Sequence, residues 1–300
     1  MSSPSIAALR SVALEVPDLD KAEAFYRDVW HLDVAARSDD ALYLRGTGAD
    51  HHLLALHGGA PAAAIRHVTL RARDAAALAR IAAATIAAGG RVVHGPRALD
   101  DPAGGTGILI SDGDGRRIEV VFGDALHGDA HEAKDRPVRL AHVVLNSHAV
   151  DPSQRFFEQA LGFRLADRTR IMAFLNCNRD HHSIALGDAD NDALNHIAFL
   201  MPDVESVMRG GGRMKDAGYA IEWGPGRHGP GNNAFNYFVG PFGEVVEYTA
   251  DVQQIDETYR VGAPSDWTWP PGRVDQWGIS APPSPRLKAA QRAVFFIPTS

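Results

Sequence analysis

An internal repeat constrains the fold of this chain more than any other feature of its sequence. Three segments of the first half recur in the same order in the second half: SVALEVPDLDKAEAFY as HVVLNSHAVDPSQRFF, RHVTLRARD as NHIAFLMPD, and DGRRIEVVF as FGEVVEYTA. The spacing agrees as well. The matched positions of the first and second segments, Ser11 and His67, lie 56 residues apart in the first copy. Their counterparts in the second copy, His142 and His196, lie 54 residues apart. A repeat of this kind indicates a duplicated structural unit.

Each copy contains a strand, a helix and further strands, and then the same series again. Residues 9–16 have a strand-like pattern, Asp18 is a suitable N-cap, and residues 18–30 place their apolar side chains on one helical face. Residues 203–218 are predicted to form the corresponding helix of the last unit. Three glycines there, each of which lowers helix stability by up to about 1 kcal/mol relative to alanine, are expected to break or shorten this helix. The sequence therefore predicts an α+β fold of four modules in two tandem domains.

The domain boundaries follow from the repeat and from one polar segment. Residues 124–138, DALHGDAHEAKDRPV, are polar and without periodicity, which predicts a linker. We expect an N-terminal domain over residues 1–134 and a second domain over residues 135–255. Residues 256–300 include a Pro- and Trp-rich stretch and are expected to form a tail. Such a tail could cover the mouth of a pocket in its own or a neighbouring subunit.

Charge and cysteine content exclude several classes of function. A net charge of −7 and a pI near 6.0 argue against a nucleic-acid footprint or an anionic-membrane surface. The single cysteine, Cys177, excludes an intrachain disulfide framework and a Cys-based zinc site. No apolar run approaches the roughly 20 residues that span a bilayer, and the N-terminus does not resemble a secretory signal. The sequence predicts a cytoplasmic protein without a membrane or nucleic-acid partner.

The repeat also places possible metal ligands at matched strand positions. The second copy carries two histidines and a glutamate there, namely His142, His196 and Glu247. The first copy carries a serine, a histidine and a glutamate, namely Ser11, His67 and Glu119. Two imidazoles and one carboxylate are the facial triad of non-heme Fe(II) oxygenases, which leaves open positions on the metal. The alternative is that His142 and His196 are hydrogen-bonded core histidines.

Five motifs of the second copy resemble a known family. RLAHVVL, NRDHHSIAL, LNHIAF, GPGRHGPGNNAFNYF and GEVVEYTAD together are similar to the type I extradiol ring-cleaving dioxygenases of the vicinal oxygen chelate superfamily. The resemblance covers about residues 8–255 in overall plan and is specific in the second half. It implies the vicinal oxygen chelate fold, also called the glyoxalase/bleomycin resistance/dioxygenase fold, in which each domain pairs two βαβββ modules.

The resemblance implies a role for each matching residue. It implies that Fe(II), or Mn(II), which the same ligand set accepts, binds to His142, His196 and Glu247. His182, the second histidine of NRDHHSIAL, matches the acid/base histidine of the family. The role suits an imidazole, because a group with a pKa near about 6.5 can take and return a proton near neutral pH. His228 and Tyr237 match a pair of residues beside the substrate. The N-terminal domain is expected to hold no metal, because Ser11 replaces its first ligand.

The implied reaction is the opening of a catechol-type ring by O2 to a muconic semialdehyde-type product, in aromatic degradation by a homo-oligomer. Family members that act on carboxylated catechols, such as homoprotocatechuate, have arginines around the pocket. Here Trp223 stands at one such position, and Val144 lies two residues after the first ligand. Both residues favour a substrate with an apolar or aromatic substituent.

Two other classes of function remain open at this point. One is a glyoxalase-type isomerase or glutathione transferase of the same superfamily, and the other is a metal-free protein that sequesters drugs or other small molecules. Taken without the resemblance, His181 and His182 would be a solvated loop pair, His228 an exposed loop residue and Tyr237 a packing aromatic. Eight further histidines are expected in polar loops or at helix ends: His31, His51, His52, His57, His94, His127, His131 and His148.

Overall fold

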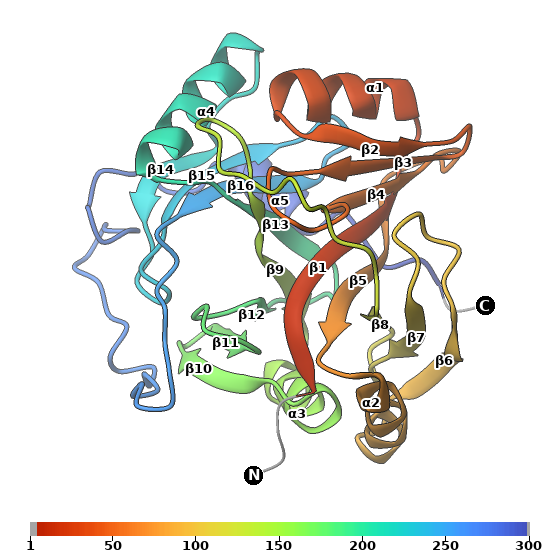
Figure 1. The fold of residues 1–300 in the computed structure, drawn as a ribbon. Coiled ribbons are helices and arrows are strands. Elements are labelled where there is room, and N and C mark those ends of the chain that lie inside the picture. The colour runs from red at the N-terminus through yellow and green to blue at the C-terminus, as the bar shows by residue number, and fades with distance from the viewer. Residues whose placement is uncertain (1–4, 299–300) are drawn as a thin grey trace.

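The computed structural model of this chain describes residues 5–298 and contains two eight-stranded sheets, one from each copy of the repeat (Figure 1). The strands of the first sheet are β1 (Ile6–Glu15), β2 (Asp33–Arg37), β3 (Ala41–Arg45), β4 (Leu54–His57), β5 (Ala64–Ala72), β6 (Arg91–Ala98), β7 (Thr106–Ser111) and β8 (Arg117–Phe122). Those of the second are β9 (Arg139–Ser147), β10 (Arg164–Arg168), β11 (Met172–Asn176), β12 (Ile184–Asp188), β13 (Leu194–Leu200), β14 (Trp223–Arg227), β15 (Ala234–Val239) and β16 (Val245–Ala250).

The strand order is the same in both sheets, which confirms the predicted duplication. It runs β2-β3-β4-β1-β5-β8-β7-β6 in the first sheet and β10-β11-β12-β9-β13-β16-β15-β14 in the second. In each module a first strand and a helix precede three strands, so the α+β fold of four βαβββ modules is confirmed. The two modules of a sheet join through an antiparallel pair, β1 with β5 and β9 with β13.

One helix follows the first strand of each module. These helices are α1 (Leu19–Glu23), which continues as a π-helix over Ala24–Val29, α2 (Ala75–Ala87), α3 (Val150–Leu161) and α4 (Val204–Asp216). The side chain of Asp18 caps the first of them by accepting a hydrogen bond from the amide of Lys21 at 2.9 Å. None of the helices in residues 5–298 is long and apolar enough to cross a membrane.

The expectation that glycines would break or shorten the helix after residue 203 was wrong. Helix α4 runs without interruption through Gly210, Gly211 and Gly212. A Cβ on Gly210 would lie 2.7 Å from the ring of Tyr248, and one on Gly211 would lie 2.8 Å from the amide of Asn236. The glycines therefore let α4 pack closely on the sheet, and this packing offsets their low helix propensity.

The two halves share one hydrophobic core. The ring of Trp30 from the first half stacks on Tyr248 of β16, with centroids 3.7 Å apart and an interplanar angle of 9°. The hydroxyl of Tyr248 donates to the carbonyl of Trp30 at 2.8 Å, and the hydroxyl of Tyr26 donates to buried Glu244 at 2.8 Å. Helices α2 and α3 also pack against each other across the boundary between the halves (Figure 1).

Residues 251–298 pack along the second half and then reach the first. They contain one short helix, α5 (Pro285–Ala290), which lies against β15. Bridges join this tail to β10 at Asp167, to β13 at Leu194 and to β5 at Ile65. The tail therefore connects the two sheets at its far end.

Candidate metal centre and active site

The register of three neighbouring strands brings His142, His196 and Glu247 to one face of the second sheet. On β13, Ala198 is the pairing partner of both His142 on β9 and Glu247 on β16. His196 lies two residues before Ala198 on β13, and side chains two residues apart point to the same face of a strand. All three candidate ligands therefore project from adjacent positions of the sheet.

The donor atoms of these three side chains converge. Nε2 of His142 lies 3.1 Å from Oε2 of Glu247, and Nε2 of His196 lies 3.2 Å from the same oxygen. Two atoms bound at right angles to one metal, each at about 2.1 Å, would lie about 3.0 Å apart. All three residues are buried, and Nδ1 of His142 and Oε1 of Glu247 have no hydrogen-bond partner in the described part of the chain. The donor set fits a divalent metal, because a buried carboxylate needs compensation.

Burial and mutual contact perturb the ionisation of this cluster. Burial alone would raise the pKa of Glu247, but the neighbouring imidazoles, His142 foremost and then His196 and His228, outweigh it and lower the pKa well below its usual range. Burial lowers the pKa of His196 to about 4, against the opposing effect of Glu247. His196 is therefore neutral near pH 7, which is the form of imidazole that binds metal.

A hydrogen bond fixes which nitrogen of His196 faces the cluster. Its Nδ1 lies 2.7 Å from Oδ1 of Asn195, an oxygen that also accepts from Gln291 of the tail at 2.9 Å. An amide oxygen only accepts, so Nδ1 of His196 carries the proton and Nε2 keeps its lone pair. Asn195 was not predicted as a site residue. The available signal was its place next to a candidate ligand.

Tyr237 and His228 lie beside the cluster. Tyr237 on β15 is the pairing partner of Glu247, and its hydroxyl lies 3.0 Å from Nε2 of His228 and 3.4 Å from Nε2 of His196. Burial, followed by the nearby Glu247, raises the pKa of Tyr237 well above its usual range, so the phenol keeps its proton. Nε2 of His228 lies 3.7 Å from Oε1 of Glu247.

His182 lies against the first candidate ligand. Its ring centroid is 4.3 Å from that of His142 and 5.1 Å from that of Phe174 on β11. Burial, followed by the neighbouring His142, lowers the pKa of His182 well below its usual range. The hydrogen bond that His182 makes, to His181 at 3.1 Å, uses its Nδ1, so Nε2 of this neutral imidazole can accept a proton from another group.

Apolar side chains flank the cluster. Val144, on the same face of β9 as His142, packs in a cluster with Phe174 and Ala185. Trp223 on β14 stacks on Tyr237, with centroids 5.0 Å apart and an interplanar angle of 29°. The structure therefore brings all eight predicted site residues together and adds Phe174, which sequence reasoning missed. Phe174 stands on an ordinary apolar strand, where nothing marks it as different from other core residues.

This geometry agrees with the comparison to known proteins. The family model described as Glyoxalase/Bleomycin resistance protein/Dioxygenase superfamily matches residues 8–120 and 139–248. The chain belongs to this superfamily. It is 31% identical to metapyrocatechase 2 of Cupriavidus necator over 299 residues, which are 90% of this chain and 88% of that protein. The predicted resemblance is confirmed.

Two solved structures are also similar to this chain. The Mn(II)-bound glyoxalase from Novosphingobium aromaticivorans is 35% identical, has a TM-score of 0.87 and covers 95% of this chain and 94% of its own. A variant of homoprotocatechuate 2,3-dioxygenase from Brevibacterium fuscum is 24% identical, with a TM-score of 0.81 over 92% of this chain and 80% of its own. The second comparison supports the fold alone.

The first half of this superfamily member contains a different arrangement at the equivalent place. Nε2 of His67 and Oε2 of Glu119 are 3.6 Å apart, and burial raises the pKa of Glu119 to about 7. The guanidinium of Arg10 donates to Oγ of Ser11 at 3.0 Å and to Nε2 of His52 at 2.9 Å. A fixed positive charge therefore stands beside the serine that replaces the first ligand.

Two histidines expected in loops or at helix ends lie in strands instead, and a third, His52, lies in a loop but is buried. His52 is fully buried, at the position equivalent to His182, and is held by Arg10 and by Asp101, whose carboxylate lies 3.3 Å from Nε2. His57 ends β4 and His94 lies within β6. The prediction was wrong for His57 and His94, and it did not foresee the burial of His52, because burial and strand pairing depend on the fold around each histidine, which local polarity does not show.

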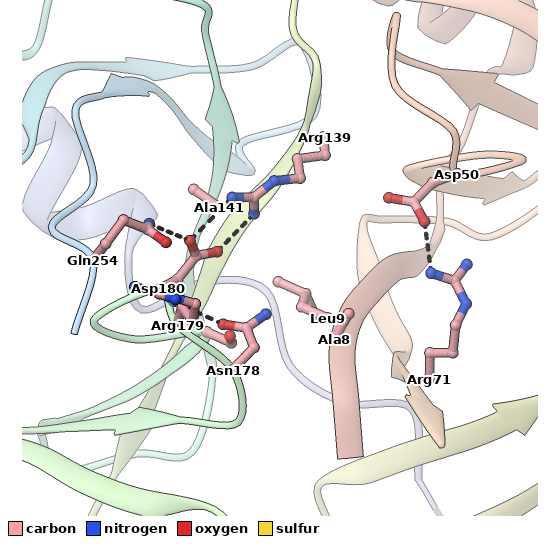
Figure 2. A pocket seen from close by; sticks show the side chains of 11 residues that line it. Ala8, Leu9, Asp50, Arg71, Arg139, Ala141, Asn178, Arg179, Asp180 and Gln254 are labelled. Atoms are coloured by element: carbon pink, nitrogen blue, oxygen red, sulfur yellow. Dashed lines mark hydrogen bonds and ion pairs between the residues drawn. The ribbon is translucent and has the colours of Figure 1, made fainter. Parts of the chain in front are cut away.

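A separate hollow of about 400 Å³ lies where the two halves meet (Figure 2). On the side of the first half, Arg71 pairs with Asp50 at 2.9 Å, and on the other side Arg139 pairs with Asp180 at 2.8 Å. Gln254 also donates to Asp180 at 2.7 Å. These charged groups are paired with one another, and none of the candidate ligands lines this hollow.

Proposed function

We propose that this chain is a metal-dependent extradiol dioxygenase that opens a catechol-type ring with O2 to give a muconic semialdehyde-type product. The observation that carries the proposal is the convergence of His142, His196 and Glu247 next to His182, an imidazole with a free nitrogen. The similarity to metapyrocatechase 2 supports the same assignment.

The metal would be held by Nε2 of His142, Nε2 of His196 and the carboxylate of Glu247. When bound there, a divalent metal supplies Lewis-acid and redox chemistry while leaving positions free for small ligands. We assign Fe(II) as this metal, with Mn(II) as the alternative that the same ligands accept. Imidazole and carboxylate ligands bind both of these metals.

The surrounding side chains would handle the substrate and its protons. His182 takes a proton from a catechol hydroxyl through Nε2 and later returns it to the opening ring, a contribution typically worth about 10²–10⁴ in rate. Tyr237 keeps its proton and donates a hydrogen bond to a substrate oxygen, and His228 orients that hydroxyl. Both atoms of O2 enter the product, so no further reductant is needed.

The walls of the site favour an apolar or aromatic substituent on the ring. Val144 and Phe174 form one apolar wall, and Trp223 extends the aromatic surface next to Tyr237. Neither wall offers a guanidinium at these positions for a carboxylate on the substrate. We further propose that the first half supports the fold without a metal, that the chain acts as a cytoplasmic homo-oligomer, and that part of the tail covers the site.

A glyoxalase-type isomerase is the second candidate, because one similar structure is a glyoxalase with bound Mn(II). The arrangement of the ligands distinguishes the two proposals. Here the complete set of two histidines and a carboxylate comes from one half, and the first half offers Arg10 and Ser11 instead of a further ligand. A metal-free binding protein is disfavoured by the buried carboxylate of Glu247, whose Oε1 has no hydrogen-bond partner in residues 5–298 and which faces Nε2 of both His142 and His196.

One experiment separates these functions. The protein is purified without oxygen, loaded with Fe(II) or Mn(II), mixed with a panel of catechols and then exposed to air. We expect oxygen uptake and the yellow colour of ring-opened semialdehydes, while a parallel assay with methylglyoxal and glutathione remains negative. Metal-loaded protein that takes up no oxygen with any catechol, or that isomerises the glutathione adduct, would refute the dioxygenase proposal.

A further inference from the structure

A buried chain of hydrogen bonds runs from the tail to His182. Nδ1 of His182 lies 3.1 Å from Nδ1 of His181, and Nε2 of His181 lies 2.7 Å from Oδ2 of Asp167 on β10. His181 and Asp167 are both fully buried. From the tail, the hydroxyl of Tyr259 donates to Oδ2 of Asp167 at 3.1 Å, and the amide of Gly262 donates to Oδ1 at 2.6 Å.

The direction of each hydrogen bond follows from what each group can do. A carboxylate only accepts, so Nε2 of His181 carries a proton and donates to Asp167. In a neutral His181, Nδ1 then has a lone pair and must accept. The proton between the two rings therefore belongs to Nδ1 of His182, and Nε2 of His182 is left with its lone pair. Burial and the adjacent carboxylate raise the pKa of Tyr259 to about 12, so this phenol also donates.

The first half contains the same pair of rings with an independent indication of direction. Nδ1 of His51 lies 3.1 Å from Nδ1 of His52, and Nε2 of His52 lies 2.9 Å from the guanidinium of Arg10. A guanidinium only donates, and it lies closer to Nε2 of His52 than the carboxylate of Asp101 does, at 3.3 Å, so we place the proton of His52 on Nδ1, from which it donates to His51. The equivalent of Asp167 in this half is Ala36, which follows the same register shift in its strand. An aspartate at this strand position therefore occurs only in the half with the candidate metal ligands, whereas the carboxylate near the first-half pair is that of Asp101, 3.3 Å from Nε2 of His52.

We propose that Asp167 and His181 are positioning residues that hold His182 with its proton on Nδ1 and its Nε2 lone pair free for the substrate. This role rests on the proposed ring-cleavage function, because it prepares His182 to take a catechol proton. Tyr259 and Gly262 complete the arrangement by giving Asp167 two further donors. The tail thereby contributes to the active site without touching the substrate.

The substitution Asp167→Asn reverses the direction of the hydrogen bonds from residue 167 through His181 to His182, because Asn has nearly the same shape as Asp but can also donate. The amide of Gly262 still needs an acceptor, so the Asn oxygen faces Gly262 and the Asn NH₂ group faces His181. His181 must then accept at Nε2 and donate from Nδ1, which moves the proton of His182 to Nε2. We expect long-range ¹⁵N–¹H spectra of metal-free, histidine-labelled protein to show His182 protonated at Nδ1 in the wild type and at Nε2 in Asp167→Asn.

Activity is the second measurement. With the metal loaded, we expect Asp167→Asn to lower kcat for catechol by about tenfold or more, with KM changed less than about twofold. Asp151→Asn is the matched control, because it makes the same change at an exposed carboxylate that pairs with Arg168, the chain neighbour of Asp167, at 3.1 Å, so tautomer and kcat should stay as in the wild type. His52 serves as an internal reference in every spectrum, since Arg10 is untouched.

The outcomes separate the proposal from the function on which it rests. A wild-type His182 protonated at Nε2, or an unchanged tautomer or kcat in Asp167→Asn, would overturn the positioning role. Should Asp167→Asn fail to fold, His181→Phe tests the same point. His182 should then populate both tautomers. A His182 that stays protonated at Nδ1 alone in this variant would contradict the positioning role of His181. A wild type that cleaves no catechol defeats the ring-cleavage function, whatever the spectra show.

Discussion

Nε2 of His142 and Oε2 of Glu247 lie 3.1 Å apart, although 105 positions separate the two residues in the sequence. Each reaches this place because it pairs with Ala198 from opposite sides of β13. The contact joins two buried groups, one of them a carboxylate with a free oxygen, and a bound metal would satisfy both.

Loss of a ligand should abolish metal binding in the second half alone. We expect His196→Ala to lower metal affinity by more than about 100-fold. Removal of a residue that only hydrogen-bonds to a ligand typically lowers it by about 10–100-fold. His67→Ala, the same change at the equivalent position of the first half, is the control and should leave metal content and activity unchanged. Metal analysis after dialysis checks both. Equal metal loss in the two variants would contradict a single site.

Replacement of His182 should separate chemistry from metal binding. We expect His182→Gln to keep its metal and to lower kcat by about 10²–10⁴, because the side chain can no longer exchange a proton with the substrate. Steady-state kinetics and metal analysis of the same sample give the answer. Loss of metal in this variant would show that His182 is a ligand.

Glu244 should make stability depend on pH. Burial raises its pKa to about 7, against an ordinary value of 4.5, despite the hydrogen bond from Tyr26. The folded state therefore binds more protons than the unfolded state between about pH 4.5 and 7, so the free energy of unfolding falls as pH rises through this window, by about 3 kcal/mol at most. Glu244→Gln removes the titrating group, and urea unfolding at several pH values should show a flatter profile. The same slope in both proteins would refute this prediction.

Trp223 should influence which catechols enter the site. We expect Trp223→Arg to increase kcat/KM for a carboxylated catechol relative to catechol by about tenfold, since a guanidinium can pair with the carboxylate. Trp223→Leu is the matched variant, because it removes the aromatic ring without adding charge and should not show this preference. A similar shift in both variants would mean that the loss of the ring, not the charge, changes selectivity.

The tail should support the loop that carries His228. A Cβ on Gly229 would lie 2.6 Å from the ring of Trp269, and Gln276 donates to the carbonyl of His228. We expect Trp269→Ala to raise KM for catechol by about three- to tenfold, or about 1 kcal/mol of binding, with a smaller effect on kcat. Ile279→Ala, at an exposed tail position, should behave as the wild type. Identical kinetics in all three proteins would exclude a role for the tail in covering the site.

Local patterns in the sequence were sufficient for the modules and for where the candidate ligands stand. The repeat aligned His142 with Ser11, His196 with His67 and Glu247 with Glu119 at matched positions of predicted strands. Helix ends were also predictable, because a cap such as Asp18 depends on residues three positions away.

Long-range contacts were decided by the tertiary structure alone. Asp167 meets His181 only because a loop and a strand of one sheet approach each other, and Arg10 meets His52 across 42 positions of sequence. Helix α4 keeps its glycines because the ring of Tyr248 and the amide of Asn236 lie close to them. Sequence periodicity shows which face a side chain takes, whereas its partner, burial and proton position depend on packing between segments distant in the chain.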